Sequence, residues 1–312
     1  MKYRILSLDG GGIKGLLTAV LLERIVAAFP QFIANVDLIA GTSTGGIIAI
    51  SLASGLAPAD VVDLYRNDGP AIFDASWVRN IKDLGDLTGA KYDNTNLHQI
   101  LTRRFGAALT LGALRKKVVV PAFDLDNSQD PYYAAAVPAG SVMRTWRPKF
   151  FHNFPGPDSD GDQLAVDVAM RTSAAPTYFP SYQHYVDGGV VANNPSMAAV
   201  AQALDTGTGG QQLGDLRVLS LGTGAVSQYI GGGNLDWGLG QWAGNFVPMM
   251  MGGVAGVADY QCQRLLGQRY CRLDPELAAN IAMDDVSQIP TLAQMAAAVD
   301  IGPIVAWLTQ WW

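Results

Sequence analysis

The sequence feature that most constrains the fold is a serine placed between a strand-like and a helix-like segment. Ser43 lies in the G-x-S-x-G element of residues 41–45, after the apolar run 36–40 and before the apolar run 46–50. In this context a tight strand-to-helix turn holds the serine in a strained conformation that exposes its hydroxyl. Side chains at Gly41 and Gly45 would collide with the neighbouring strand and helix. The pattern predicts a nucleophilic serine beside the amide donors of a helix N-terminus.

Strand-like and helix-like segments alternate along the rest of the chain. We expect strands at 4–8, 36–40, 117–123, 185–187 and 216–221, and helices at 16–29, 46–53, 57–65, 164–173 and 195–204. Residues 66–113 are expected to form the helices and loops of an insertion. This alternation predicts an α/β fold with a mostly parallel central sheet. No low-complexity linker divides the 312 residues, so we expect a single domain over residues 1–312.

Composition limits the classes of partner and the compartment. Charged residues make up 15% of the chain and apolar residues 49%, against about 25% charged in an average soluble protein. The net charge of -6 argues against a nucleic-acid partner. Cys262 and Cys271 have neither metal-ligand spacing nor a disulfide framework. With no signal peptide and no apolar run of about 20 residues, we expect a cytoplasmic protein with peripheral membrane contact and no transmembrane helix.

The loop Gly10–Gly15 matches G-x-G-x-x-G after a strand, and two interpretations compete for it. One is a dinucleotide-binding fingerprint. The other is an oxyanion hole made of glycine amides at a helix N-terminus. Asp9 directly before the glycines would repel a pyrophosphate, and a nucleophile turn follows at the next strand, so we favour the oxyanion hole. Lys14 is either a solvated first-turn residue or a cation that assists an anionic intermediate.

The base that activates Ser43 does not follow the usual pattern. In α/β-hydrolases the serine is followed by an acid and then by a histidine. The three histidines are His98, expected on the surface, His152, in a loop or core, and His184, on a strand with its side chain opposite that of Asp187. Since no histidine follows His184, the expected triad histidine is missing.

Asp187 is the preferred base. It ends a predicted strand and is followed by Gly188 and Gly189, which let the chain turn sharply and bring the carboxylate into a cleft. A carboxylate accepts the serine proton if burial raises its pKa toward neutrality. The alternative is an ordinary Asp-Gly turn.

Taken together, residues 9–15, 41–45 and 187–189 resemble the patatin-like phospholipases, the family of plant patatin and bacterial lipid acyl hydrolases. Stretches 171–180, 193–195 and 218–224 are also similar to this family, so the resemblance covers roughly residues 4–224. It implies a three-layer α/β/α fold and a Ser-Asp dyad of Ser43 and Asp187 without calcium or any other cofactor or metal. The implied oxyanion hole consists of Gly10, Gly11 and Gly12, and the supporting motif residues are Asp9, Lys14, Gly15, Gly41, Gly45, Gly188 and Gly189.

The expected function is a lipid acyl hydrolase of the phospholipase A or lipase-esterase type. Its substrate would be a phospholipid or another acyl-ester lipid, cleaved by two-step acyl transfer. The alternatives are a carboxylesterase for short soluble esters, a catalytically silent lipid-binding module and a nucleotide-dependent oxidoreductase. The sequence does not indicate an oligomeric state.

Residues 225–312 are expected to form a helical region that contributes a substrate channel or lid. Residues 237–256 are rich in Gly, Met and aromatics, which suits either acyl chains or ordinary core packing. Residues 304–312 carry three tryptophans. This terminal segment is either a membrane-docking or lid element, or a final helix packed on the body.

Overall fold

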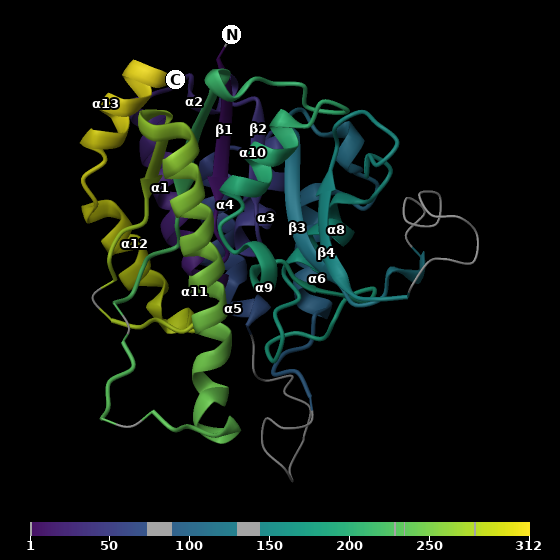
Figure 1. The fold of residues 1–312 in the computed structure, drawn as a ribbon, viewed down its shortest axis with the longest axis vertical. Coiled ribbons are helices and arrows are strands. Elements are labelled where there is room, and N and C mark those ends of the chain that lie inside the picture. The colour runs from purple at the N-terminus through teal and green to yellow at the C-terminus, as the bar shows by residue number, and fades with distance from the viewer. Residues whose placement is uncertain (1, 74–88, 130–143, 228, 234, 278) are drawn as a thin grey trace.

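The computed structural model describes residues 2–73, 89–129, 144–227, 229–233, 235–277 and 279–312 (Figure 1). Its centre is a sheet in the order β4-β3-β2-β1-β6-β7, with β5 also paired to β3. Strands β1, β2, β3, β6 and β7 run parallel, whereas β4 and β5 pair antiparallel with β3. The strands are β1 (Tyr3–Leu8), β2 (Leu38–Gly41), β3 (Lys117–Asp124), β4 (Arg147–His152), β5 (Tyr185–Asp187), β6 (Leu216–Leu221) and β7 (Tyr270–Leu273).

Helices cover both faces of this sheet (Figure 1). One face carries α1 (Gly15–Ala28), α3 (Thr44–Ser54), α4 (Pro58–Asp63), α6 (Thr95–Phe105), α8 (Ala165–Thr172), α12 (Ile289–Ala298) and α13 (Gly302–Trp311). The other face carries α10 (Ser196–Leu204) and the 28-residue α11 (Leu239–Leu266). The remaining short helices are α2 (Phe32–Asn35), α5 (Gly69–Ile72) and α9 (Gly189–Ala192).

Buried side chains on both faces of the strands hold the three layers together. Successive strand residues point to opposite faces, so neighbours in β1 such as Ile5 and Leu6 enter different cores. Both are fully buried, as are Leu38 and Ile39 in β2. Strands apolar on both faces are typical of a parallel sheet covered by helices. The expected three-layer α/β fold with a mostly parallel sheet is therefore confirmed.

Two strands escaped the sequence analysis. β4 contains His152, which was expected in a loop or core, and pairs antiparallel with β3. β7 comes from the C-terminal region, expected to be helical, and extends the parallel sheet beside β6. β7 has only four residues, and β4, although as long as β1, is distinguished from a loop segment only by its hydrogen bonding to β3. The expected insertion at 66–113 falls partly outside the described residues, and its described part includes the regular helix α6.

Among the described helices, none by itself combines at least 18 residues with the apolarity needed to cross a bilayer. The bent pair Val286–Ala298 and Gly302–Trp311, at 59° to one another, meets this criterion when the two are counted together.

Candidate active site

Ser43 occupies a strained turn between β2 and α3. Its φ of 54° and ψ of -123° place a non-glycine residue in a sparsely populated region, as in a nucleophile elbow. A Cβ at Gly41 would collide with the Gly45 carbonyl oxygen, and a Cβ at Gly45 would collide with the Leu8 carbonyl oxygen of β1. The two glycines thus allow the strand and the helix to approach closely enough to form the turn.

The backbone of Ser43 is held by the side chain of Thr172, the last residue of the neighbouring helix α8. The Ser43 amide donates to Thr172 Oγ1 over 2.9 Å, and the Thr172 hydroxyl in turn donates to the Pro121 carbonyl over 2.5 Å. All three groups are buried. This chain of hydrogen bonds links α8 and β3 to the serine turn and fixes the Ser43 backbone.

Asp187 ends β5 and lies next to Ser43. Its carboxylate accepts the Gly189 amide over 2.7 Å, and its own amide donates to the Ala174 carbonyl over 3.0 Å. Burial raises the pKa of Asp187 to about 6, against the lowering effect of hydrogen bonds from the Ser43 side chain and the Gly189 amide. Asp187 is 3% exposed and Ser43 7%. The structure therefore brings these two predicted residues into hydrogen-bonding contact.

None of the three histidines lies among the residues that line the cavity beside Ser43. His152 is buried in β4 with Nε2 3.3 Å from Asp158 Oδ2, and the His98 ring lies near that of Tyr182. The expectation that His184 lies on the strand of Asp187 is wrong. His184 precedes β5 and adopts a φ of 67°, because the chain turns there between Tyr182 and Tyr185.

The glycine loop lies directly beside Ser43, but its three amides are not equivalent. The Gly10 amide donates to the Asn193 carbonyl over 3.0 Å, so it is not free to bind an oxyanion, contrary to the expectation for Gly10. Within the described part of the chain, the amides of Gly11 and Gly12 have no acceptor. Gly12 adopts a φ of 61° and lines the same cavity as Ser43. The loop therefore offers two free donors.

The other motif residues frame this loop. Asp9 is buried at the end of β1 and forms an ion pair with Arg272. Lys14 is half-buried, which disfavours the fully solvated alternative, and burial lowers its pKa. Gly15 begins α1, while Gly188 and Gly189 lead from β5 into α9.

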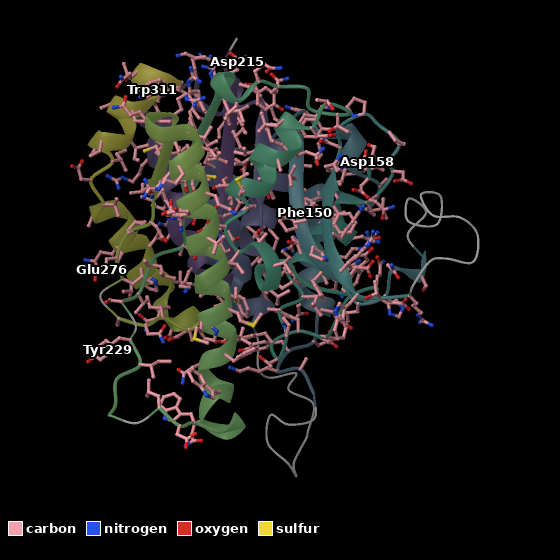
Figure 2. The ribbon with its side chains drawn as sticks, viewed as in Figure 1. Phe150, Asp158, Asp215, Tyr229, Glu276 and Trp311 are labelled. Carbon is pink, nitrogen blue, oxygen red and sulfur yellow. The ribbon has the colours of Figure 1, made fainter. Side chains whose placement is uncertain are left out.

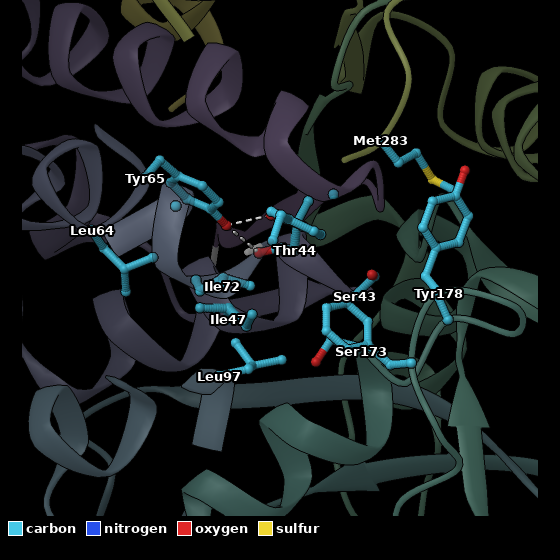
Figure 3. A pocket seen from close by; sticks show the side chains of 15 residues that line it. Ser43, Thr44, Ile47, Leu64, Tyr65, Ile72, Leu97, Ser173, Tyr178 and Met283 are labelled. Carbon is cyan, nitrogen blue, oxygen red and sulfur yellow. Dashed lines mark hydrogen bonds between the residues drawn. The ribbon is translucent and has the colours of Figure 1, made fainter. Parts of the chain in front are cut away.

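Two cavities adjoin the glycine loop, and Ser43 lines the first of them. The first, about 570 Å³ with its open mouth, is mostly apolar and runs from Ser43 toward Tyr65 (Figure 3). Its apolar lining includes Ile47, Leu64, Ile72, Phe73, Leu97 and Phe179. The second is a wide groove lined by Gly10, Gly11 and one face of α11. Tyr178 and Met283 line both cavities and form the ridge between them, next to Ser43 in Figure 3.

Several residues of this region were not weighed individually in the sequence. Thr172 and Thr223 lie inside stretches that resemble the family, so a signal for them existed. Met283 and Arg272 lie beyond those stretches. The Met283 carbonyl accepts the Ile13 amide over 2.7 Å, and a Cβ at Gly12 would collide with it. No local pattern indicates such a contact across 270 positions.

Comparison with known proteins places this arrangement in a family. The chain matches the family description "Patatin-like phospholipase" over residues 6–200. It is 30% identical to a "cGAMP-activated phospholipase" of Pseudomonas aeruginosa over 90% of this chain and 81% of that protein. It is 29% identical to "Protein teg" of Priestia megaterium over 100% of this chain and 99% of that protein. Among solved structures, VipD from Legionella pneumophila overlaps at a TM-score of 0.40 with 13% identity, over 94% of this chain and 67% of that one.

The chain belongs to the patatin-like phospholipase family. It is a lipid acyl hydrolase, an enzyme that cleaves carboxylic ester bonds of lipids. This membership decides against the dinucleotide interpretation of the glycine loop and against a catalytically silent module.

Proposed function

We propose that Ser43 and Asp187 form the catalytic dyad of this hydrolase. The observation that carries the proposal is the hydrogen bond between the side chain of a serine in a strained turn and a buried carboxylate whose pKa is raised to about 6. Such a carboxylate is basic enough to accept the serine proton near neutral pH. Asp187 takes the proton as Ser43 Oγ attacks the ester carbonyl, and the acid then returns a proton to the leaving alcohol. Water hydrolyses the resulting acyl-enzyme.

The oxyanion of the tetrahedral intermediate is held by the amides of Gly11 and Gly12. These two amides lack acceptors in the described part of the chain, whereas that of Gly10 is engaged by Asn193. Preorganised amides stabilise the charge that develops in the transition state. Lys14 lines the groove on the same side and places a cation near this charge.

The two cavities suggest how the substrate lies. The apolar cavity between Ser43 and Tyr65 accommodates the acyl chain, since its lining is mostly apolar and Ser43 lies in its wall. The groove along α11 accommodates the leaving alcohol with the rest of the lipid. Met251 supports this orientation, because its side chain lies against Gly189 in the loop after Asp187 and also lines the groove.

We further propose a single domain in which residues 225–312 supply this channel and the face that meets the membrane. Residues 239–258 of α11 contain no charged side chain, and the first turns of the helix project beyond the sheet (Figure 1). Phe246, Met249, Met250, Val257 and Tyr260 share one exposed face of α11 at helical spacing. This face, which we term the α11 apolar face, adjoins the one that lines the groove. A lipid extracted from a bilayer under this face would reach Ser43 along the helix.

Labelling by a fluorophosphonate tests the dyad. The wild-type enzyme should be labelled and should release fatty acid from phospholipid vesicles, while Ser43→Ala should do neither. Asp187→Asn should be labelled at a strongly reduced rate, because the serine then lacks its base. Thr309→Ala, which removes an exposed hydroxyl on α13, is the matched control and should behave as wild type. Labelling that persists in Ser43→Ala would contradict the assignment.

A further inference from the structure

Arg272 forms an ion pair with Asp9, the residue directly before the glycine loop, although the two lie 263 positions apart in the sequence. It belongs to β7, opposite Ser220 of β6, and its side chain is 16% exposed. The family match ends at residue 200, so β7 lies outside it. A largely buried guanidinium close to the proposed oxyanion donors is a candidate for positioning them.

The guanidinium joins side chains from three neighbouring parts of the sheet. It donates to Ser220 Oγ over 2.8 Å, to Asp9 Oδ2 over 2.7 Å and to Asp274 Oδ2 over 2.8 Å. Arginine suits this task because its planar group presents several donors in a fixed geometry. The ends of β1, β6 and β7 are thus connected through one side chain.

Both sides of this connection reach the glycine loop. Asp9 directly precedes Gly10, so fixing its carboxylate fixes the start of the loop. Asp274 Oδ1 accepts the Gly224 amide over 2.9 Å, and the neighbouring Thr223 hydroxyl donates to the Gly10 carbonyl over 3.0 Å. The loop is therefore held at its start by Asp9 and at the Gly10 carbonyl by Thr223. Arg272 connects these two contacts, because it donates hydrogen bonds to both Asp9 and Asp274.

The charge of Asp9 depends on this contact. Burial raises the pKa of Asp9 to about 7, Arg272 opposes that shift, and the nearby carboxylates of Asp274 and Asp259 add to it. Asp9 Oδ1 is buried and has no hydrogen-bond partner in the described part of the chain. Without Arg272 the carboxylate would be a buried charge lacking its ion pair, and such groups become neutral or relocate.

We propose that Arg272 is a positioning residue for the ester hydrolysis: by clamping Asp9 and Asp274 it holds the amides of Gly11 and Gly12 where the oxyanion forms. The inference rests on the proposed Ser43 site and extends it to a residue outside the family match. Arg272 acts through Asp9, so it should influence the chemical step more than substrate binding.

The test compares kcat and KM of Arg272→Met on a soluble nitrophenyl ester, which removes any effect of membrane binding. We expect kcat to fall about 10²-fold with KM within about threefold, since misplacement of catalytic groups by about 1 Å has an effect of this size. Lys149→Met is the matched control. Lys149, on β4, is equally exposed at 16% and pairs with buried Asp160, so its loss should lower stability and leave kcat unchanged.

A double-mutant cycle with Asp9→Asn then separates positioning from general destabilisation. If Arg272 acts through Asp9, Arg272→Met should lower kcat much less in the Asp9→Asn background than in the wild type. Equal losses in both backgrounds, or wild-type kcat in folded Arg272→Met, would overturn the proposal. If Arg272→Met does not fold, Asp9→Asn alone decides, and a folded variant with wild-type kcat overturns it. Retained hydrolysis in Ser43→Ala would instead refute the dyad itself.

Discussion

Two apolar segments of the C-terminal region differ in their exposure to solvent in the folded protein. The first half of α11 combines methionines, glycines and aromatics, and α13 with the residue after it carries three tryptophans. α11 projects at the carboxyl end of the strands with Phe246 and Met250 52% and 39% exposed. Trp312, in contrast, is 6% exposed and packs in a tilted arrangement against Phe32, with ring centroids 5.2 Å apart.

The positions of the two segments relative to Ser43 also differ. The Trp312 carbonyl accepts hydrogen bonds from Lys2 and Arg4, at the amino end of β1. Trp311 lies at that end of the molecule in Figure 2, whereas the exposed Tyr229 lies at the opposite end. Ser43 follows the carboxyl end of β2. The tryptophan segment is therefore a final helix packed on the body. It does not form a lid over Ser43, because it lies at the amino end of β1 whereas Ser43 lies at the carboxyl end of β2.

The comparison teaches that apolar composition alone does not distinguish a working surface from a core helix. What distinguishes them is which end of the parallel sheet each segment reaches, since loops at the carboxyl ends of the strands build the site. The following experiments test this difference between the two segments.

The largest effect is expected at the α11 end, where the proposed dyad lies. Asp187→Asn should lower kcat about 10³-fold on a soluble ester, because a positioned general base contributes on this scale. Asp167→Asn serves as the control, because it alters another carboxylate that accepts a hydrogen bond from a hydroxyl, that of Tyr182. A kcat within a few fold of wild type in folded Asp187→Asn would show that another group acts as the general base.

At the other end the expected effect is on stability. Trp312→Ala should reduce the free energy of unfolding by about 3 kcal/mol, since it removes a buried aromatic side chain from its contact with Phe32. Chemical denaturation measures this, and vesicle hydrolysis by the folded variant should stay at the wild-type level. A folded Trp312→Ala enzyme that no longer binds vesicles would restore the tryptophan segment as the docking element.

The α11 apolar face predicts a smaller, substrate-dependent effect. Phe246→Glu/Met250→Glu should lower hydrolysis of anionic phospholipid vesicles about tenfold, a change that corresponds to about 1.4 kcal/mol. The rate on a soluble nitrophenyl ester should not change, because neither side chain lines the groove. Trp146→Glu/Phe150→Glu introduces two charges at exposed apolar positions near β4 and should leave both rates unaltered. Equal losses on both substrates would indicate a folding defect and not a docking surface.

The smallest effect concerns pH. Asp187 acts as a base only when ionised, and its pKa is raised to about 6, so activity should increase with pH through 6 and then level off. Between pH 6 and pH 8 the gain in kcat/KM should be about twofold, with a decline of about tenfold per pH unit well below 6. The acid limb should persist in Asp9→Asn, although the pKa of Asp9 lies at about 7. A rate independent of pH between 4 and 8 would exclude this carboxylate as the base.

Much of the fold was predictable from local pattern. The strand at 4–8, the serine turn and the helices at 16–29, 164–173 and 195–204 correspond to observed elements within a few residues. β7 was not predictable, because four residues with mixed burial carry no periodic signal. The engagement of the Gly10 amide was equally hidden, since its acceptor, the Asn193 carbonyl, lies 183 positions away and any residue carries such a group.

Local sequence specifies the conformations on which the chemistry of this enzyme depends. A serine between two glycines, a glycine run after a strand and an Asp-Gly-Gly turn require backbone conformations that few other residues allow. Tertiary structure decided which of these groups work together. It brought the Ser43 side chain next to Asp187 and paired the Gly10 amide with the Asn193 carbonyl, while the amides of Gly11 and Gly12 stayed free in the described part of the chain. It also placed Arg272 in contact with Asp9, directly before the loop. It also buried Trp312 and exposed the first half of α11. The physical reason is that φ/ψ limits act within a few residues, whereas hydrogen-bond partners and burial depend on contacts between distant segments.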